Sequence, residues 1–227
     1  MKEDICTIPV NEVMVVRDGC PICRMCDTLE EHMLNFILGD AMMEPDVRIE
    51  TNHQSFCDKH FSLLLGRKNR LALALILESR LDTIEKSIFS KGFATSVKGN
   101  IEKIKNTMGR CYICKRVDTA LDRLLNTFFI LWKKEDEFRA NFGSQPMICL
   151  PHYHLLLKKG QASLDKKSFG AFETQAENVI REGLSSLKAD VSGFCKMFDY
   201  HNAGAEWGTK RDAIERAISF ETGRRKK

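Results

Sequence analysis

The feature that most constrains this chain is a pattern of cysteine and histidine residues that occurs twice. Each copy has a Cys-x-x-Cys pair followed, after a gap that differs by one residue between the copies, by a Cys-x-x-His pair. The residues of the pattern are Cys20, Cys23, Cys57 and His60 in the first copy and Cys111, Cys114, Cys149 and His152 in the second. Flanking residues repeat too, as in Leu63-Leu64-Leu65 and Leu155-Leu156-Leu157. The chain therefore contains an internal duplication.

The spacing within each pair is typical of metal ligands. Two residues between cysteines allow a tight turn to bring both sulfurs to ~2.3 Å from one zinc ion. Residues three apart on the first turn of a helix share a face, so a Cys-x-x-His pair can add a sulfur and a nitrogen to the same ion. We expect one tetrahedral site within each copy, and so two zinc ions per chain. Four protein ligands fill the coordination shell, which favours a structural role over a catalytic one.

Two other chemistries fit part of the pattern. A dithiol redox enzyme or sensor is the main alternative, because a helix that starts at Cys20-Pro21-Ile22-Cys23 could lower the pKa of one thiol. Against it, the second copy has Tyr112 where the first has Pro21, and redox chemistry gives no role to Cys57 and His60. An iron–sulfur cluster is a less favoured alternative.

No enzyme motif accompanies the ligand pattern. The sequence contains no GxSxG, no HExxH and no glycine-rich phosphate loop. We therefore expect a binding or scaffolding protein with an unknown protein partner rather than an enzyme. Nucleic-acid binding has weak support, because the net charge of +4 is spread along the chain and only the tail, residues 223–227, is strongly basic.

Cysteine usage and hydropathy indicate the compartment. Of the nine cysteines, six have ligand spacing, and in a reducing compartment such a pattern favours metal over disulfides. The first ten residues lack the basic flank and apolar core of a signal peptide. The longest apolar run, residues 71–77, is far shorter than the roughly 18 residues that span a bilayer. We expect a cytoplasmic protein that does not contact a membrane.

Apolar periodicity predicts an all-α fold, with two duplicated CxxC…CxxH helical modules followed by a long amphipathic helix. Predicted helices cover residues 23–39, 57–89 with a bend near Gly66, 101–108, 117–132, 169–198 and 210–220. A brief extended segment is expected at residues 7–16, and a connecting loop at residues 43–50. Cys195 belongs to the apolar stripe of the long helix, so we expect it to be buried.

The repeat also suggests a domain division. The segment SKGFATSVKGN at residues 90–100 has two glycines and several small polar residues, which is typical of a linker. It separates a first metal-binding module, residues 1–95, from a second, residues 96–160. Residues 161–227 would form C-terminal helices and a basic tail packed on the modules.

The paired motifs GCPIC…FCDKH and RCYIC…CLPHY, together with the stretch from Phe194 to Tyr200, carry a resemblance over the full length of the chain. The chain resembles an uncharacterised family of bacterial cytoplasmic proteins with duplicated CxxC…CxxH motifs. The resemblance implies a bacterial source and no established activity.

Overall fold

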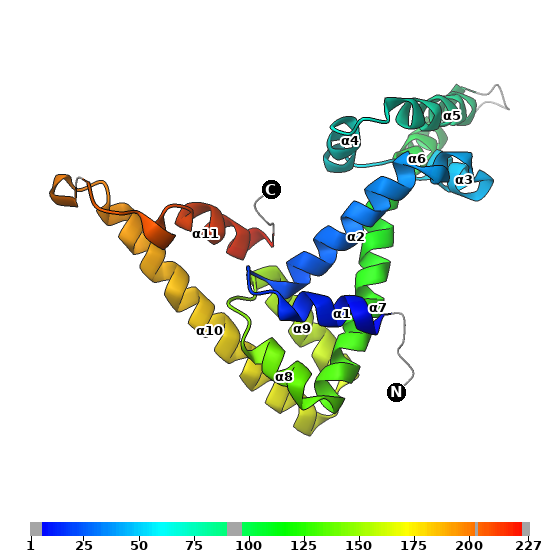
Figure 1. Cartoon of the computed structure of the whole chain (residues 1–227). Coiled ribbons are helices and arrows are strands. Elements are labelled where there is room, and N and C mark those ends of the chain that lie inside the picture. The colour runs from blue at the N-terminus through cyan, green and yellow to red at the C-terminus, as the bar shows by residue number, and fades with distance from the viewer. Residues whose placement is uncertain (1–5, 90–96, 203, 224–227) are drawn as a thin grey trace. The chain divides into compact units, whose positions relative to one another are not determined.

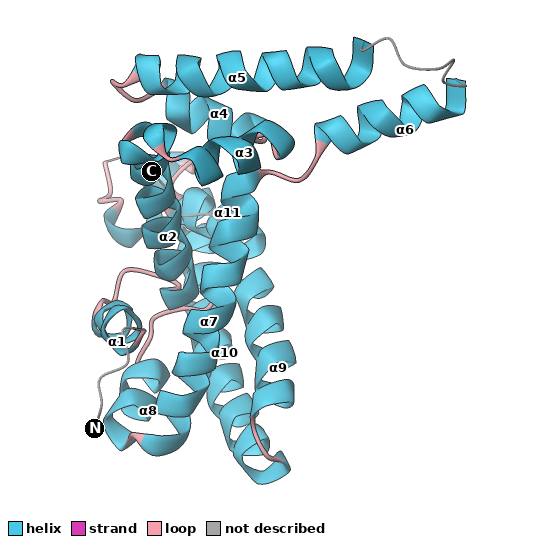
Figure 2. Cartoon of the chain, turned by 90° about the vertical axis from the view of Figure 1, so that its right-hand side faces the viewer, coloured by secondary structure: helices cyan, strands magenta, loops and turns pink. Residues whose placement is uncertain are grey.

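The protein is described by a computed structural model that covers residues 6–89, 97–202 and 204–223. Within these residues the chain forms eleven α-helices, short 3-10 turns and no strands, which confirms the all-α prediction (Figures 1 and 2). The helices are α1 (Thr7–Val15), α2 (Pro21–Leu38), α3 (Pro45–His53), α4 (Asp58–Leu65), α5 (Arg70–Phe89), α6 (Val97–Met108), α7 (Tyr112–Lys134), α8 (Asp136–Gly143), α9 (Leu150–Ser163), α10 (Lys166–Lys196) and α11 (Ala213–Thr222). The predicted linker at residues 90–100 lies partly outside the described residues, and its last part already belongs to α6.

The chain divides into two compact units. Unit 1 consists of residues 1–27 and 121–227, and unit 2 consists of residues 28–120. These boundaries fall inside α2 and α7, so each of these two helices begins in one unit and ends in the other. The compact units thus do not coincide with the repeats at residues 1–95 and 96–160.

Aromatic side chains form the core of unit 1. Phe128, Phe142 and Phe172, from α7, α8 and α10, are completely buried. The rings of Phe128 and Phe142 meet edge to face with centroids 5.3 Å apart, and those of Phe142 and Phe172 stack at 5.6 Å. A side chain at Gly160 of α9 would come within 3.2 Å of the Phe172 ring, so this glycine allows α9 to approach closely.

Helix α1 replaces the extended segment expected at residues 7–16, and that prediction is wrong. Val10 and Met14 lie four residues apart and are both fully buried, so the segment has one apolar helical face that packs near α8. Its last carbonyls also have partners, because Arg24 donates to Val13 O at 2.8 Å and Gln145 donates to Met14 O at 2.8 Å.

Unit 2 has a separate aliphatic core. The buried residues of this core are Leu34, Ile37, Leu38, Ala41, Val47, Phe56, Leu64, Ala72, Leu73, Ile76, Tyr112 and Ile113.

Two predictions of local structure in unit 2 are wrong. The loop expected at residues 43–50 is largely α3, because Pro45 occupies its first turn and Val47 faces the core. The helix expected to bend near Gly66 is two helices. Helix α4 ends at Leu65 with Gly66 as its C-cap, and the side chain of Asn69 accepts from Ala72 N at the start of α5.

The long amphipathic helix is confirmed as α10. Asp165 caps it by accepting from Ser168 N at 3.0 Å, and its buried stripe is Phe172, Ala176, Val179, Gly183 and Leu187. Cys195, however, is exposed, so the prediction of a buried thiol is wrong. Near the end of α10, the covered face of the helix carries Gly193, where an added side chain would meet Lys210. Cys195 lies two positions further along the helix and therefore points to a different face.

The aromatic core of unit 1 yields a stability prediction. Phe172→Ala removes a fully buried ring and should lower the free energy of unfolding by about 3–5 kcal/mol. Leu184→Ala, on the exposed face of the same helix, should change it by less than about 1 kcal/mol. Urea unfolding followed by circular dichroism measures both, and equal losses would contradict the assigned core.

Candidate metal centres

The eight predicted ligands meet in two groups. Each group combines the Cys-x-x-Cys pair of one copy with the Cys-x-x-His pair of the other copy. The unit 1 centre contains Cys20, Cys23, Cys149 and His152, and the unit 2 centre contains Cys57, His60, Cys111 and Cys114. Within each group, all four ligand atoms lie within 4.8 Å of one another. The ligands converge as three sulfurs and one imidazole, as expected, while the prediction that each copy forms its own site is wrong.

Helix length explains the crossed pairing. After Cys114, α7 continues for twenty residues to Lys134, which carries the chain about 30 Å away at 1.5 Å per residue. Only residues 135–148 then precede Cys149, and eight of them form α8. Such a short and mostly helical segment barely has the length to bring Cys149 back to Cys114. The constraint is weaker in the first copy, where α2 runs for fifteen residues, about 22 Å, beyond Cys23 and eighteen residues then precede Cys57.

Both centres are built in the same way, from the N-termini of two helices. Cys20 directly precedes α2, and Cys149 is the N-cap of α9. In the unit 2 centre, Cys111 directly precedes α7 and Cys57 is the N-cap of α4. The positive end of a helix dipole stabilises a thiolate, so each centre receives this contribution from two helices.

The distances in the unit 1 centre fit a tetrahedral ion. Ligands ~2.3 Å from zinc at tetrahedral angles are about 3.8 Å apart for two sulfurs and about 3.5 Å for a sulfur and a nitrogen. Here the sulfurs of Cys23 and Cys149 are 3.7 Å apart. His152 Nδ1 lies 3.6, 3.3 and 3.1 Å from the sulfurs of Cys20, Cys23 and Cys149, respectively. A disulfide would require about 2.05 Å between sulfurs.

The unit 2 centre has matching geometry. The sulfurs of Cys57 and Cys114 are 3.9 Å apart. His60 Nδ1 lies 3.1 Å from Cys57, 3.2 Å from Cys111 and 3.5 Å from Cys114, measured to each sulfur. In both centres Nδ1 of the histidine therefore faces the sulfurs, and Nε2 is left for a second contact.

These second contacts differ between the centres. His60 Nε2 lies 3.0 Å from Glu30 Oε1, and Glu30 also pairs with Lys59. His152 Nε2 instead lies 3.8 Å from the sulfur of Cys26. A carboxylate on the far nitrogen of a ligand histidine fixes its tautomer and makes it a better ligand. Glu30 was not among the predicted site residues, because a glutamate on the polar face of a helix has the pattern of an ordinary solvated residue.

The thiols of each centre share protons unequally. In the unit 2 centre, burial would raise the pKa of Cys111, but hydrogen bonds with His60 and the neighbouring cysteines lower it to about 6. Burial and the hydrogen bond with Cys111 raise the pKa of Cys114 to about 12. In the unit 1 centre, hydrogen bonds outweigh burial and lower the pKa of Cys20, while the same network raises that of Cys23. A bound cation would replace the shared protons, since metal ligands are deprotonated thiols.

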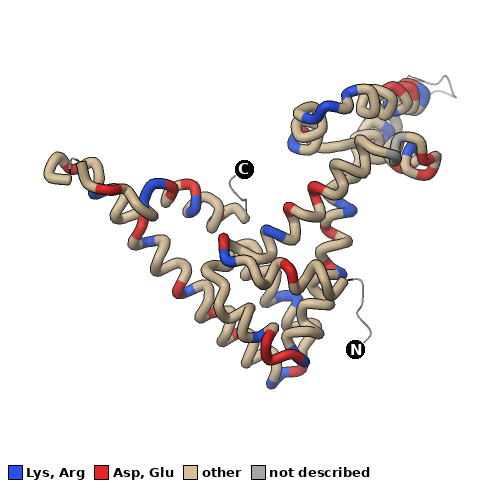
Figure 3. Tube along the Cα trace, viewed as in Figure 1, with Lys and Arg blue, Asp and Glu red and all other residues tan. Residues whose placement is uncertain are grey.

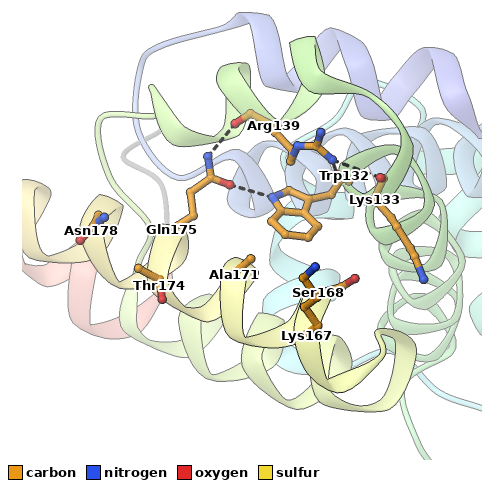
Figure 4. A pocket seen from close by; sticks show the side chains of 9 residues that line it. All are labelled: Trp132, Lys133, Arg139, Lys167, Ser168, Ala171, Thr174, Gln175 and Asn178. Carbon is orange, nitrogen blue, oxygen red and sulfur yellow. Dashed lines mark hydrogen bonds between the residues drawn. The ribbon is translucent and has the colours of Figure 1, made fainter.

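Unit 1 also has a hollow of about 640 Å³ beside α8 and α10, which is distinct from the metal centre (Figure 4). Its wall is fixed by Gln175, which accepts from Trp132 Nε1 at 2.7 Å and donates to Arg139 O at 2.8 Å. Two of the three cations on its rim have carboxylate partners, because Lys133 pairs with Asp165 at 2.7 Å and Arg139 pairs with Asp136; the third cation is Lys167. Most of the positive charge around this hollow is therefore already compensated.

The chain belongs to a family of unknown function, DUF6062, whose model matches residues 1–227. No curated protein and no solved structure matches the chain. Among the described helices, none combines the length and the apolar character needed to cross a membrane.

Paired substitutions test the crossed arrangement. The double variant Cys23→Ser/Cys149→Ser changes two ligands of one centre, so the metal content should fall from two ions per chain to one. Cys23→Ser/Cys57→Ser changes one ligand in each centre and should lower the content further, towards zero. Elemental analysis after gel filtration gives the stoichiometry. If Cys23→Ser/Cys57→Ser retained one ion and Cys23→Ser/Cys149→Ser lost both, each site would instead form within one copy.

Glu30 should raise the metal affinity of the unit 2 centre alone. Glu30→Gln removes the carboxylate charge beside His60 Nε2 and should weaken metal binding there by about 10- to 100-fold. Glu31→Gln is the matched control, because Glu31 is an exposed neighbour that pairs with Arg67. Competition with a coloured chelator measures both affinities, and equal affinities in the two variants would exclude this role.

Proposed function

Because membership of a family of unknown function assigns no activity, we propose from the geometry that this protein binds two structural zinc ions and acts as a binding or scaffolding protein. The observation that carries the proposal is the donor set, three sulfurs and one nitrogen at tetrahedral spacing in each centre. Thiolate and imidazole donors in a tetrahedron suit zinc. Four protein ligands leave no coordination position for a substrate, which favours a structural ion.

The ions would act by holding distant parts of the chain together. The unit 1 centre joins residues 126 to 132 positions apart, and the unit 2 centre joins residues 51 to 57 positions apart. The ligand sets exist only in the folded chain, so the free energy of metal binding adds directly to folding. Unit 1 in particular is made of two separate segments, which its ion would tie together.

Exposed aromatic side chains support the binding role. Near the end of α10, the rings of Phe194, Phe198 and Trp207 contact one another with centroids 5.3 to 6.0 Å apart. Phe198 is nevertheless 73% exposed and Tyr200 is 80% exposed. Exposed aromatic groups of this kind are typical of surfaces that contact another protein. Nucleic acid is a weaker candidate, since acidic and basic residues are interspersed along the described helices (Figure 3).

A dithiol redox enzyme or sensor remains the second candidate, favoured by the pKa of about 6 at Cys111. The described cysteines are all free thiols, which agrees with a reducing, cytoplasmic environment under either proposal. The two roles differ in what the thiols do. A structural ion keeps them as ligands, whereas a redox role needs a disulfide that forms and is reduced again.

Metal removal separates the two roles. Protein purified without added metal should contain two zinc ions per chain, and a strong chelator should lower its melting temperature by at least about 10 °C, because the binding energy is folding energy. Re-addition of zinc should restore the melting temperature. If the purified protein lacks metal and instead forms a reversible disulfide between Cys111 and Cys114, the redox role replaces the structural one.

A further inference from the structure

Unit 2 contains a small polar pocket that none of the eight metal ligands lines. The pocket has a volume of about 260 Å³ and lies between the end of α3 and the second halves of α5 and α6. Its lining residues are Asn52, His53, Arg80, Thr83, Ser87, Lys103, Asn106 and Thr107. They comprise two cations, one imidazole, three hydroxyls and two amides, with no carboxylate and no purely apolar side chain.

Arg80 is the unusual member of this set, because its charge is buried without a counter-ion. The residue is only 6% exposed, and neither Arg80 nor Lys103 has a carboxylate partner within the part of the chain that the structure describes. Burial accordingly lowers the pKa of the Arg80 guanidinium. A buried ion without a partner costs several kcal/mol relative to water, so such sites normally contain a compensating group.

The protein supplies only part of that compensation. The two terminal nitrogens of Arg80 donate to the carbonyls of Asn52 and Thr107, which lie in the last turns of α3 and α6. The negative ends of two helices thus offset some of the charge. Among the described residues, nevertheless, neither Arg80 Nε nor Asn52 Oδ1 has a hydrogen-bond partner. A guanidinium has five N–H donors, so the backbone contacts leave donors unused.

The walls of the pocket are well anchored. Asn52 and His53 lie a few residues before the ligand Cys57, and Thr107 lies four residues before the ligand Cys111. The two segments are also joined directly, because Tyr112 N donates to Ser55 O at 2.9 Å. Side chains on such a framework are held ready for a ligand, which lowers the entropy lost on binding.

We propose that this pocket binds the phosphate group of a small molecule through Arg80 and Lys103. A guanidinium and an ammonium group in one pocket are suited to a doubly charged oxyanion, because charge-assisted hydrogen bonds are the strong ones. The hydroxyls of Thr83 and Ser87 also line the pocket; they donate to the carbonyls of Ser79 and Ile84, both at 3.0 Å, and would have to rotate to donate to a phosphate oxygen. The unit 1 hollow differs in this respect, because two of its three cations, Lys133 and Arg139, already have carboxylate partners.

Calorimetric titration of the full-length, metal-loaded protein tests the proposal, with glycerol phosphate, inorganic phosphate and glycerol as probes. Lys103→Gln should weaken the binding of glycerol phosphate by at least about tenfold, the usual effect of losing one charge-assisted hydrogen bond. Lys105→Gln removes the same charge from α6 at an exposed position paired with Glu102, and should weaken binding by less than about twofold.

Each result of the titration has a defined meaning. Tighter binding of glycerol phosphate than of inorganic phosphate assigns the pocket to a phosphate ester, and equal binding assigns it to free phosphate. Arg80→Lys keeps the charge and should still weaken binding, with circular dichroism to show that α3 and α6 remain folded. Absence of saturable binding, equal losses in Lys103→Gln and Lys105→Gln, or binding of glycerol itself would overturn the proposal.

Discussion

Convergence of three sulfurs and one imidazole at the starts of two helices is the constraint on which both units depend. In unit 1 it joins the start of α2 to the start of α9, and in unit 2 the start of α7 to the start of α4. Three thiolates around a divalent ion leave one net negative charge, which the positive ends of two helices can stabilise. The positions of these helix starts are therefore inseparable from the positions of the ligands.

The sequence was sufficient to identify the ligands but not their partners. Spacing alone picks out Cys20, Cys57 and the other six residues, because local turns and first helical turns decide which atoms point the same way. Spacing does not show which Cys-x-x-His pair meets which Cys-x-x-Cys pair. Both Cys-x-x-His pairs offer the same atoms, so Cys23 could in chemical terms pair with either. Helix length decides between them, and helix ends are the least certain part of any sequence-based prediction.

Short helices were harder to predict than long ones for a related reason. Over thirty residues, the spacing of Phe172, Val179 and Leu187 repeats often enough to identify α10. Helix α1 has only the pair Val10 and Met14 to reveal its buried face, and Pro9 argues against a helix there. Its stability comes from packing and from the carbonyl contacts of Arg24 and Gln145, which lie far along the chain. Such tertiary contributions override local propensity.

The two centres have the same set of ligand atoms, but different groups lie beside the Nε2 atoms of their histidines. Glu30 places a negative charge on the far nitrogen of His60, which strengthens that imidazole as a ligand. At the unit 1 centre the corresponding neighbour is the thiol of Cys26, and the carbonyl of Gly223 accepts from Cys23 Sγ at 3.2 Å. A sulfur at 3.8 Å polarises the ring less than a carboxylate oxygen at 3.0 Å does. Duplication has thus produced two centres with one donor set, in which the second contact of the histidine distinguishes one centre from the other.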